Sequence, residues 1–160
     1  MKTAIIFYSL DGNCAFVAKQ IATQLNATMI HLQLEDEKKR RGFIKMLWGC
    51  KMMFSRKNPP LKPYTFDPAE YDLLIVGAPV WAGLPAAPLR TFVSGNSVTG
   101  KKIALFVCHA GGQGKALEKF GNLFAGNDIV AKTDFNNPAT QMLSEELKQQ
   151  IADWAKGVAS

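Results

Sequence analysis

The sequence predicts a three-layer, doubly wound α/β fold built on a five-stranded parallel sheet. Strand-like and helix-like segments alternate along the chain, which is typical of parallel βαβ units. The strand-like segments are nearly unbroken apolar runs, as expected where helices cover both faces of a sheet. The predicted strands run from Ala4 to Tyr8, Met29 to Leu34, Leu73 to Val76, Ile103 to Val107, and Ile129 to Phe135.

Helical spacing of apolar residues follows several of these strands, and each helical segment carries one apolar stripe. The three clearest stripes lie within residues 17–25, 116–124 and 143–154. Pro85 and Pro88 are assigned to the first turn of a further helix, because a missing backbone N–H costs little there. That helix carries the apolar residues Leu89, Phe92 and Val93.

Length and charge limit the possible classes of protein. A chain of 160 residues can bury a core without disulfides, and residues 1–160 are expected to form one domain. Nine Lys or Arg residues and no acidic residue lie between Lys38 and Lys62, whereas the remainder carries ten basic and thirteen acidic residues. The net charge of +6 therefore belongs to a basic insert at about residues 38–63, and we expect no nucleic-acid partner.

The insert has its own helical pattern, with two adjacent apolar stripes between residues 43 and 54. Asn58, Pro59 and Pro60 are expected to end this helix. Its wide apolar surface has three interpretations that stay open. It covers a ligand, it forms a homodimer contact through residues 43–56, or it is a core helix with a solvated basic face.

Several other classes are not indicated. No apolar segment approaches the roughly 20 residues of a membrane-spanning helix, and no secretory leader is visible, so we expect a cytoplasmic protein without a membrane span. Cys14, Cys50 and Cys108 are widely spaced and form no Cys-x-x-Cys pair. This spacing argues against a disulfide framework or a zinc site, and we expect no bound metal.

A short loop between the first strand and the first helix is the strongest indication of function. Small and polar residues at a helix N-terminus bring backbone N–H groups together where the helix dipole favours negative charge. A phosphate monoester fits such a loop, although Gly12 and Asn13 would also make an ordinary tight turn. The loop consists of Ser9, Leu10, Asp11, Gly12, Asn13 and Cys14.

This loop resembles the phosphate loop of the flavodoxin family, whose usual pattern is Ser/Thr-x-Thr-Gly-Asn-Thr. The resemblance implies a flavodoxin-like sheet with strand order 2-1-3-4-5 and flavin mononucleotide (FMN) as the cofactor. Two positions depart from the pattern: Asp11 replaces a hydroxyl residue, and Cys14 replaces a Thr or Ser that binds phosphate. A carboxylate repels a dianion and a thiol is a poor donor, so backbone N–H groups would carry more of the binding.

A second segment, Gly77–Pro85, follows the third strand and resembles the flavin-flanking segment of the same family. In flavodoxin-like sheets the winding reverses here, and ligands bind at such a point. Trp81 is interpreted as a ring that stacks on the flavin or borders it, with ordinary core packing as the alternative. The resemblance places Pro79, Val80, Trp81, Ala82 and Gly83 beside the flavin.

A third loop follows the fourth strand, and its Cys-His-Ala-Gly-Gly segment resembles the loop that holds the opposite edge of the ring in small flavin-binding relatives. We do not expect Cys108 and His109 to form a catalytic pair, because neighbours on a strand point to opposite sides. Cys108 is interpreted as a residue whose side chain serves in packing. His109 either tunes the flavin and relays protons or faces solvent. The resemblance assigns cofactor binding to Cys108, His109, Ala110, Gly111, Gly112 and Gly114.

Together, the three loops predict an FMN-binding protein that transfers electrons. No side chain is expected to be catalytic, because the flavin supplies the redox chemistry and the protein holds it. Two roles stay open: a carrier that serves a redox partner protein, and a reductase that takes hydride from NAD(P)H and reduces a quinone or other small acceptor. The alternative is a binding or regulatory module that has kept the fold and lost the flavin.

Overall fold

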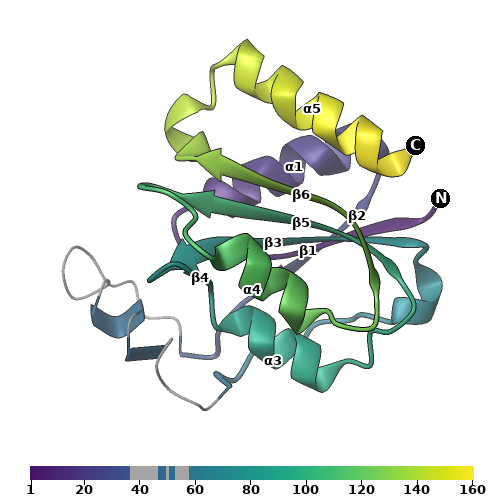
Figure 1. The fold of residues 1–160 in the computed structure, drawn as a ribbon, viewed down its shortest axis with the longest axis vertical. Coiled ribbons are helices and arrows are strands. Elements are labelled where there is room, and N and C mark those ends of the chain that lie inside the picture. Colours follow the sequence, from purple (N-terminus) through teal and green to yellow (C-terminus); the bar gives the residue numbers. More distant parts are fainter. Residues whose placement is uncertain (37–46, 50, 53–57) are drawn as a thin grey trace.

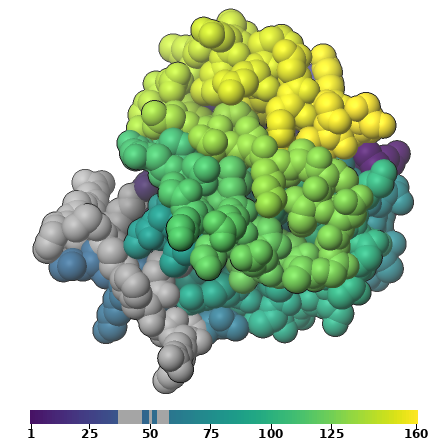
Figure 2. Space-filling model, viewed as in Figure 1, coloured from purple at the N-terminus to yellow at the C-terminus, as the bar shows by residue number. Residues whose placement is uncertain are grey.

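The structure is a computed structural model that describes residues 1–36, 47–49, 51–52 and 58–160. It confirms the predicted architecture, in which a parallel sheet lies between two layers of helices (Figure 1). One face is covered by α1 (Asn13–Leu25) and α5 (Glu145–Ala159). The other face is covered by α3 (Pro88–Gly95) and α4 (Ala116–Leu123). In the space-filling view, α5 lies at the top in yellow and the region around α4 covers much of the same side in green (Figure 2).

Within the described residues, five long parallel strands pair in the order β2-β1-β3-β5-β6. Counted along the chain without a short extra strand, β4, this is the predicted order 2-1-3-4-5. The winding of the chain reverses between β1 and β3, where a ligand site is expected. The long strands are β1 (Thr3–Tyr8), β2 (Thr28–Leu32), β3 (Leu73–Trp81), β5 (Lys102–His109) and β6 (Asp128–Asn136).

The sheet divides the apolar core into two layers, which explains why the strands are apolar without alternation. Along β1, Ile5 and Phe7 pack with residues of α1 and α5. Ile6 and Tyr8 point to the opposite layer and pack with residues of α3 and α4. All four side chains are buried. Among the described residues, no helix has both the length and the apolarity that a membrane crossing requires.

The segment after the third strand differs from the prediction, because it is a β-hairpin rather than a loop. β3 continues to Trp81, and the chain turns at residues 82–83 into β4 (Leu84–Pro85), which pairs antiparallel with β3. Pro85 therefore lies in a strand. Pro88 alone stands in the first turn of α3, where it was predicted.

The last helix also begins later than the apolar spacing predicted. The hydroxyl oxygen of Ser144 accepts a hydrogen bond from the N–H group of Leu147 at 3.2 Å, which caps α5 at that point. Leu143 lies outside the helix and is exposed. A short 3₁₀ helix, η2 (Pro138–Gln141), precedes this cap, and a second one, η1 (Pro68–Glu70), precedes β3.

The basic insert at about residues 38–63 leaves and rejoins the fold at one place beside β2. Leu34 and Leu61 form an antiparallel bridge there. The N–H group of Lys62 donates to the carbonyl oxygen of Gln33 at 2.8 Å. The two ends of the insert are therefore held together by backbone hydrogen bonds.

Only part of the insert is described. Residues 47–49 and 51–52 are helical, which agrees with the predicted helix at those positions. The remainder of the predicted 43–54 helix lies outside the described residues. The same is true of most of the 43–56 surface proposed for a homodimer, so that proposal stays a prediction.

The position of Gly77 generates a test of the packing in the core. A Cβ atom at this position would overlap the Cζ atom of Phe106, whose ring is fully buried. We expect Gly77→Ala to lower the free energy of unfolding by about 1–3 kcal/mol, because the ring must shift in a close-packed core. Urea denaturation measures this change.

Gly157→Ala is the matched control, since an added Cβ on this exposed turn of α5 would meet no atom within 4 Å. It should leave the free energy of unfolding unchanged or raise it by up to about 1 kcal/mol through helix propensity. Equal stability of Gly77→Ala and the unmodified chain would contradict the close contact with Phe106.

Candidate functional site

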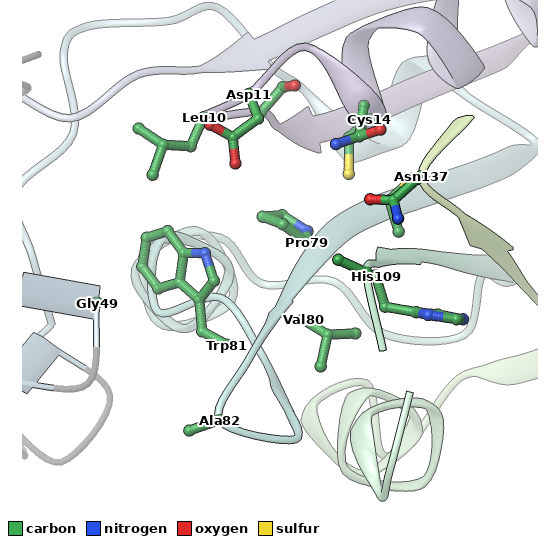
Figure 3. Close-up of a pocket in the computed structure, with 14 residues that line it drawn as sticks. Leu10, Asp11, Cys14, Gly49, Pro79, Val80, Trp81, Ala82, His109 and Asn137 are labelled. Carbon is green, nitrogen blue, oxygen red and sulfur yellow. The ribbon is translucent and has the colours of Figure 1, made fainter. Parts of the chain in front are cut away.

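A cleft of about 420 Å³ opens at the carboxyl ends of β1, β3 and β5 (Figure 3). It lies where the winding of the sheet reverses, which is the usual place for a ligand in an open α/β fold. Its volume falls in the range of small-molecule sites, roughly 300–1,000 Å³. The position and size of the cleft thus make it the candidate site.

The structure brings the three predicted loops together around this cleft. The predicted residues that line it are Ser9, Leu10, Asp11, Asn13, Cys14, Pro79, Val80, Trp81, Ala82, Cys108, His109 and Ala110. The predicted glycines belong to the same loops but do not line its wall; they are Gly12, Gly83, Gly111, Gly112 and Gly114. Two further residues that line the cleft, Gly49 and Asn137, are not predicted from the sequence.

The first loop prepares the start of α1 to receive an anion. Gly12 precedes the helix with a φ of +85°, a left-handed conformation that glycine adopts without a Cβ clash. The Ser9 hydroxyl oxygen accepts from the N–H group of Ala15 at 3.1 Å, which leaves its own hydrogen for another acceptor. The N–H groups of Asn13 and Cys14 have no hydrogen-bond partner in the described part of the chain. These donors and the helix dipole would together favour a bound anion.

Two residues at this end of the cleft oppose anion binding. Figure 3 shows the Asp11 carboxylate and the Cys14 sulfur directed into the cleft. Burial raises the pKa of the Cys14 thiol well above its usual range, and a side-chain hydrogen bond with Cys108 and the charge of Asp11 add to that rise. Cys14 is therefore a neutral, weak donor. Within the described residues, no three His, Cys, Asp or Glu side chains lie close enough together to hold a metal ion.

The β3–β4 hairpin forms the opposite wall. Ala82 and Gly83 have φ values of +50° and +72°, so the two-residue turn follows the twist of the strands. Trp81 precedes this turn and contacts Tyr8 and Trp48 edge-on, with ring centroids 5.6 Å apart in each case. The Trp81 ring is packed by aromatic neighbours and also lines the cleft, so its role beside a flavin stays a prediction.

The third loop lies against this hairpin. A Cβ atom at Gly114 would lie 3.3 Å from the Cα atom of Gly83, and the φ of Gly114 is +54°. A larger residue at this position would strain the backbone and crowd the hairpin. The glycine therefore lets the second and third loops approach each other.

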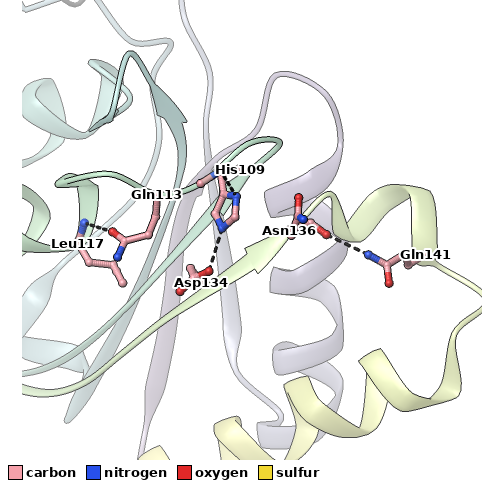
Figure 4. Close-up of polar contacts among 7 residues, drawn as sticks. His109, Gln113, Leu117, Asp134, Asn136 and Gln141 are labelled. Atoms are coloured by element: carbon pink, nitrogen blue, oxygen red, sulfur yellow. Dashed lines mark hydrogen bonds and ion pairs between the residues drawn. The ribbon is translucent and has the colours of Figure 1, made fainter.

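His109 ties the third loop to the edge of the sheet (Figure 4). Its Nδ1 atom accepts from the N–H group of Gly112 at 3.0 Å, and its Nε2 atom lies 2.8 Å from a carboxylate oxygen of Asp134. Since Nδ1 accepts, the ring hydrogen belongs on Nε2, where it donates to Asp134. The side chain is only 9% exposed, so His109 is not a solvent-facing residue. Both ring nitrogens are engaged with protein groups.

Asn137 and Gly49 complete the wall from outside the three predicted loops. Asn137 follows β6 with a φ of +43°, and its N–H group donates to the carbonyl oxygen of His109 at 2.8 Å. The Asn-Pro pair after the last predicted strand could have indicated that Asn137 lies at the site. That strand ends at the same edge of the sheet as the three loops, and Asn-Pro is typical of a turn. Gly49 belongs to the insert, and a Cβ there would lie 3.8 Å from the Trp81 ring. Its place agrees with an insert that covers a ligand.

A doubly wound sheet of this order, with a cleft at its point of reversal, defines the flavodoxin-like fold. No protein-family model and no curated protein matches the sequence. Solved structures do match. A flavoprotein from Lactobacillus acidophilus in complex with FMN is 21% identical, with a TM-score of 0.74 over 89% of this chain and 99% of that one.

Two further structures extend the likeness. A protein from Bacteroides eggerthii, provisionally called a flavoprotein, is 17% identical, with a TM-score of 0.82 over 99% of this chain and 98% of that one. Oxidised flavodoxin 1 from Bacillus cereus is 19% identical, with a TM-score of 0.58 over 99% and 97% of the two chains. At these identities the matches establish the fold, and this chain has the flavodoxin-like fold.

The contacts of His109 generate a test of how the third loop is held. His109→Ala removes both ring contacts, so we expect faster hydrogen exchange at the Gly112 amide, by about tenfold, and a stability loss of about 1–2 kcal/mol. Asp134→Asn is the matched control, because it keeps an oxygen acceptor for Nε2–H. Asp134 is 43% exposed, so this change should cost less than about 1 kcal/mol. If hydrogen exchange at the Gly112 amide is unaltered in His109→Ala, the His109 ring does not hold the third loop.

Proposed function

We propose that the chain binds FMN in this cleft and transfers electrons through it. One observation carries the proposal: three loops that resemble flavin-binding segments surround a single cleft at the reversal point of the sheet. The fold matches that of a flavoprotein solved in complex with FMN, which supports the choice of cofactor. Bound FMN would supply the redox chemistry, and the protein would hold it, limit solvent access and set its potential.

The donors at the start of α1 would hold the phosphate. The N–H groups of Asn13 and Cys14 and the hydroxyl of Ser9 can all donate to an anion at this point. Asp11 reduces the binding free energy of the phosphate, because its carboxylate is directed into the same end of the cleft and repels an anion. We infer that the phosphate contributes less to affinity here than in a loop with hydroxyl residues at positions 11 and 14.

The hairpin and the third loop would hold the ring of the flavin. Pro79, Val80 and Trp81 offer an apolar wall, and an aromatic ring can stack offset against an indole. On the third loop, the lining residues are Cys108, His109 and Ala110. The tie between His109 and Gly112 would orient this loop so that its backbone faces the edge of the ring.

Of the two electron-transfer roles, we favour the NAD(P)H-dependent reductase. Carriers that this sequence resembles tend to be acidic, whereas this chain has a net charge of +6 that lies in its insert. The basic residues of the insert would attract a phosphorylated cosubstrate such as NAD(P)H. One residue of the insert, Gly49, lines the cleft. The acceptor would then be a quinone or another small molecule.

FMN binding generates the first test of this function. Titration of the purified protein with FMN should quench flavin fluorescence and raise the melting temperature, since a ligand that binds the folded state stabilises it. We expect Trp81→Ala to raise the Kd for FMN about tenfold through lost ring contact, and Trp81→Phe to raise it less.

Riboflavin is the matched ligand control, because it shares the ring of FMN and lacks the phosphate. FMN should bind more tightly than riboflavin if the start of α1 holds the phosphate. If neither flavin changes fluorescence or melting temperature, the chain is a module with a flavodoxin-like fold and no flavin, and the proposed function is wrong.

The choice of role is tested by anaerobic reduction of the FMN-loaded protein. NADH or NADPH alone should bleach the flavin absorbance within seconds and support repeated turnover with a quinone, because a reductase takes hydride directly. Dithionite provides the fully reduced reference. Bleaching by dithionite or by a partner reductase, with none by either nicotinamide, would instead identify an electron carrier.

A further inference from the structure

Two thiols meet inside the cleft. Cys14 stands in the first turn of α1 and Cys108 stands near the end of β5, and both line the cleft. Both side chains also belong to one buried apolar cluster, and the Cys108 side chain is close enough to help raise the pKa of the Cys14 thiol. Both cysteines are free, and they are only 1% and 3% exposed. The fold has therefore brought together two reduced sulfurs from distant parts of the sequence.

The surroundings leave these thiols few reaction partners. The core layer that contains them also holds Phe7, Phe106 and Phe135, so apolar groups surround the pair away from the cleft. Among the described residues the two thiols belong to no group of three side chains that could hold a metal ion. What reaches the two sulfurs must be small and must enter through the cleft that they line.

We propose that Cys14 and Cys108 are a site of reversible disulfide formation and that this modification lowers the affinity of the cleft for flavin. The oxidant is hydrogen peroxide. Two S–H bonds and the O–O bond break, one S–S bond and two O–H bonds form, and two water molecules leave. Two electrons pass from the sulfurs to the peroxide, and a dithiol reductant such as dithiothreitol reverses the change.

The positions of the two residues permit this bond. The two sulfurs line one cleft and must approach to about 2.05 Å, which side-chain rotation and small backbone shifts at two element ends can supply. The raised pKa of the Cys14 thiol lowers the fraction present as thiolate, which is the reactive form. Burial makes the reaction slower than that of an exposed thiol.

The link to flavin rests on the proposed function. Cys14 lies at the end of the cleft where phosphate would bind, and the disulfide removes its S–H donor and pulls the first turn of α1 toward β5. We expect the Kd for FMN to rise at least about fivefold in the oxidised protein. Conversely, FMN in the cleft would block peroxide and slow the oxidation at least about fivefold.

The experiment uses the full chain with Cys50→Ser, which removes the third cysteine. This protein is treated with hydrogen peroxide in the presence and absence of FMN, and then analysed by intact mass, free-thiol titration and peptide mapping. The expected result is a loss of about 2 Da, both thiols blocked, and a linked peptide pair containing residues 14 and 108. Dithiothreitol should restore both thiols and the original Kd for FMN.

The variants Cys14→Ser and Cys108→Ser, each made in the Cys50→Ser chain, are the matched controls and should show no loss of about 2 Da. A gain of oxygen without a disulfide, or only disulfides between chains, would overturn the proposed site. An unchanged Kd for FMN in the oxidised protein would overturn the coupling. Failure of the reduced protein to bind FMN would refute the proposed function instead, because the disulfide is detected by mass without flavin.

Discussion

The parallel register of β1, β3 and β5 determines where the three loops of the cleft lie. Phe7 pairs with Gly77, and Gly77 pairs with Phe106, so the three strands end together at one edge of the sheet. Burial of both faces holds this register, because a slip by one residue would turn each side chain to the opposite layer. Gly77 makes the arrangement possible, since the Phe106 ring occupies the space of a side chain at that position. The cleft thus depends on strand pairing more than on any single loop.

The sequence predicts the layers and the strand order well because these follow from local patterns of apolar residues. It fails at the β3–β4 hairpin, where the turn is Ala82-Gly83 rather than the Asn-Gly that usually signals such a turn. Alanine seldom adopts a φ of +50°, so nothing in the local pattern indicates that Ala82 does. The start of α5 was misplaced for a similar reason: apolar spacing extended the helix to Leu143, whereas the cap at Ser144 sets its boundary.

The candidate site, like the fold, was predictable from the sequence only in part. Its three loops were predictable because each follows a strand, and parallel strands of one sheet end at one edge. The contacts among the loops were not predictable, because they join residues far apart in the sequence. His109 reaches Asp134, and Cys14 reaches Cys108, only after the strands have paired. Such contacts decide which groups are available to a ligand, and they show that His109 connects the third loop to β6, while its role as a proton relay stays a prediction.

The side-chain oxygen of Asn13 accepts a hydrogen bond from the N–H group of Ala139 at 2.9 Å, across 126 residues of sequence. On the ribosome, the first loop is synthesised early, but this bond has no donor until η2 has been made. At typical translation rates of 5–20 residues per second, the delay is roughly 6–25 s. During that interval the wall of the cleft that contains Asn13 and Asn137 is incomplete, and it is finished only after the last strand has been synthesised.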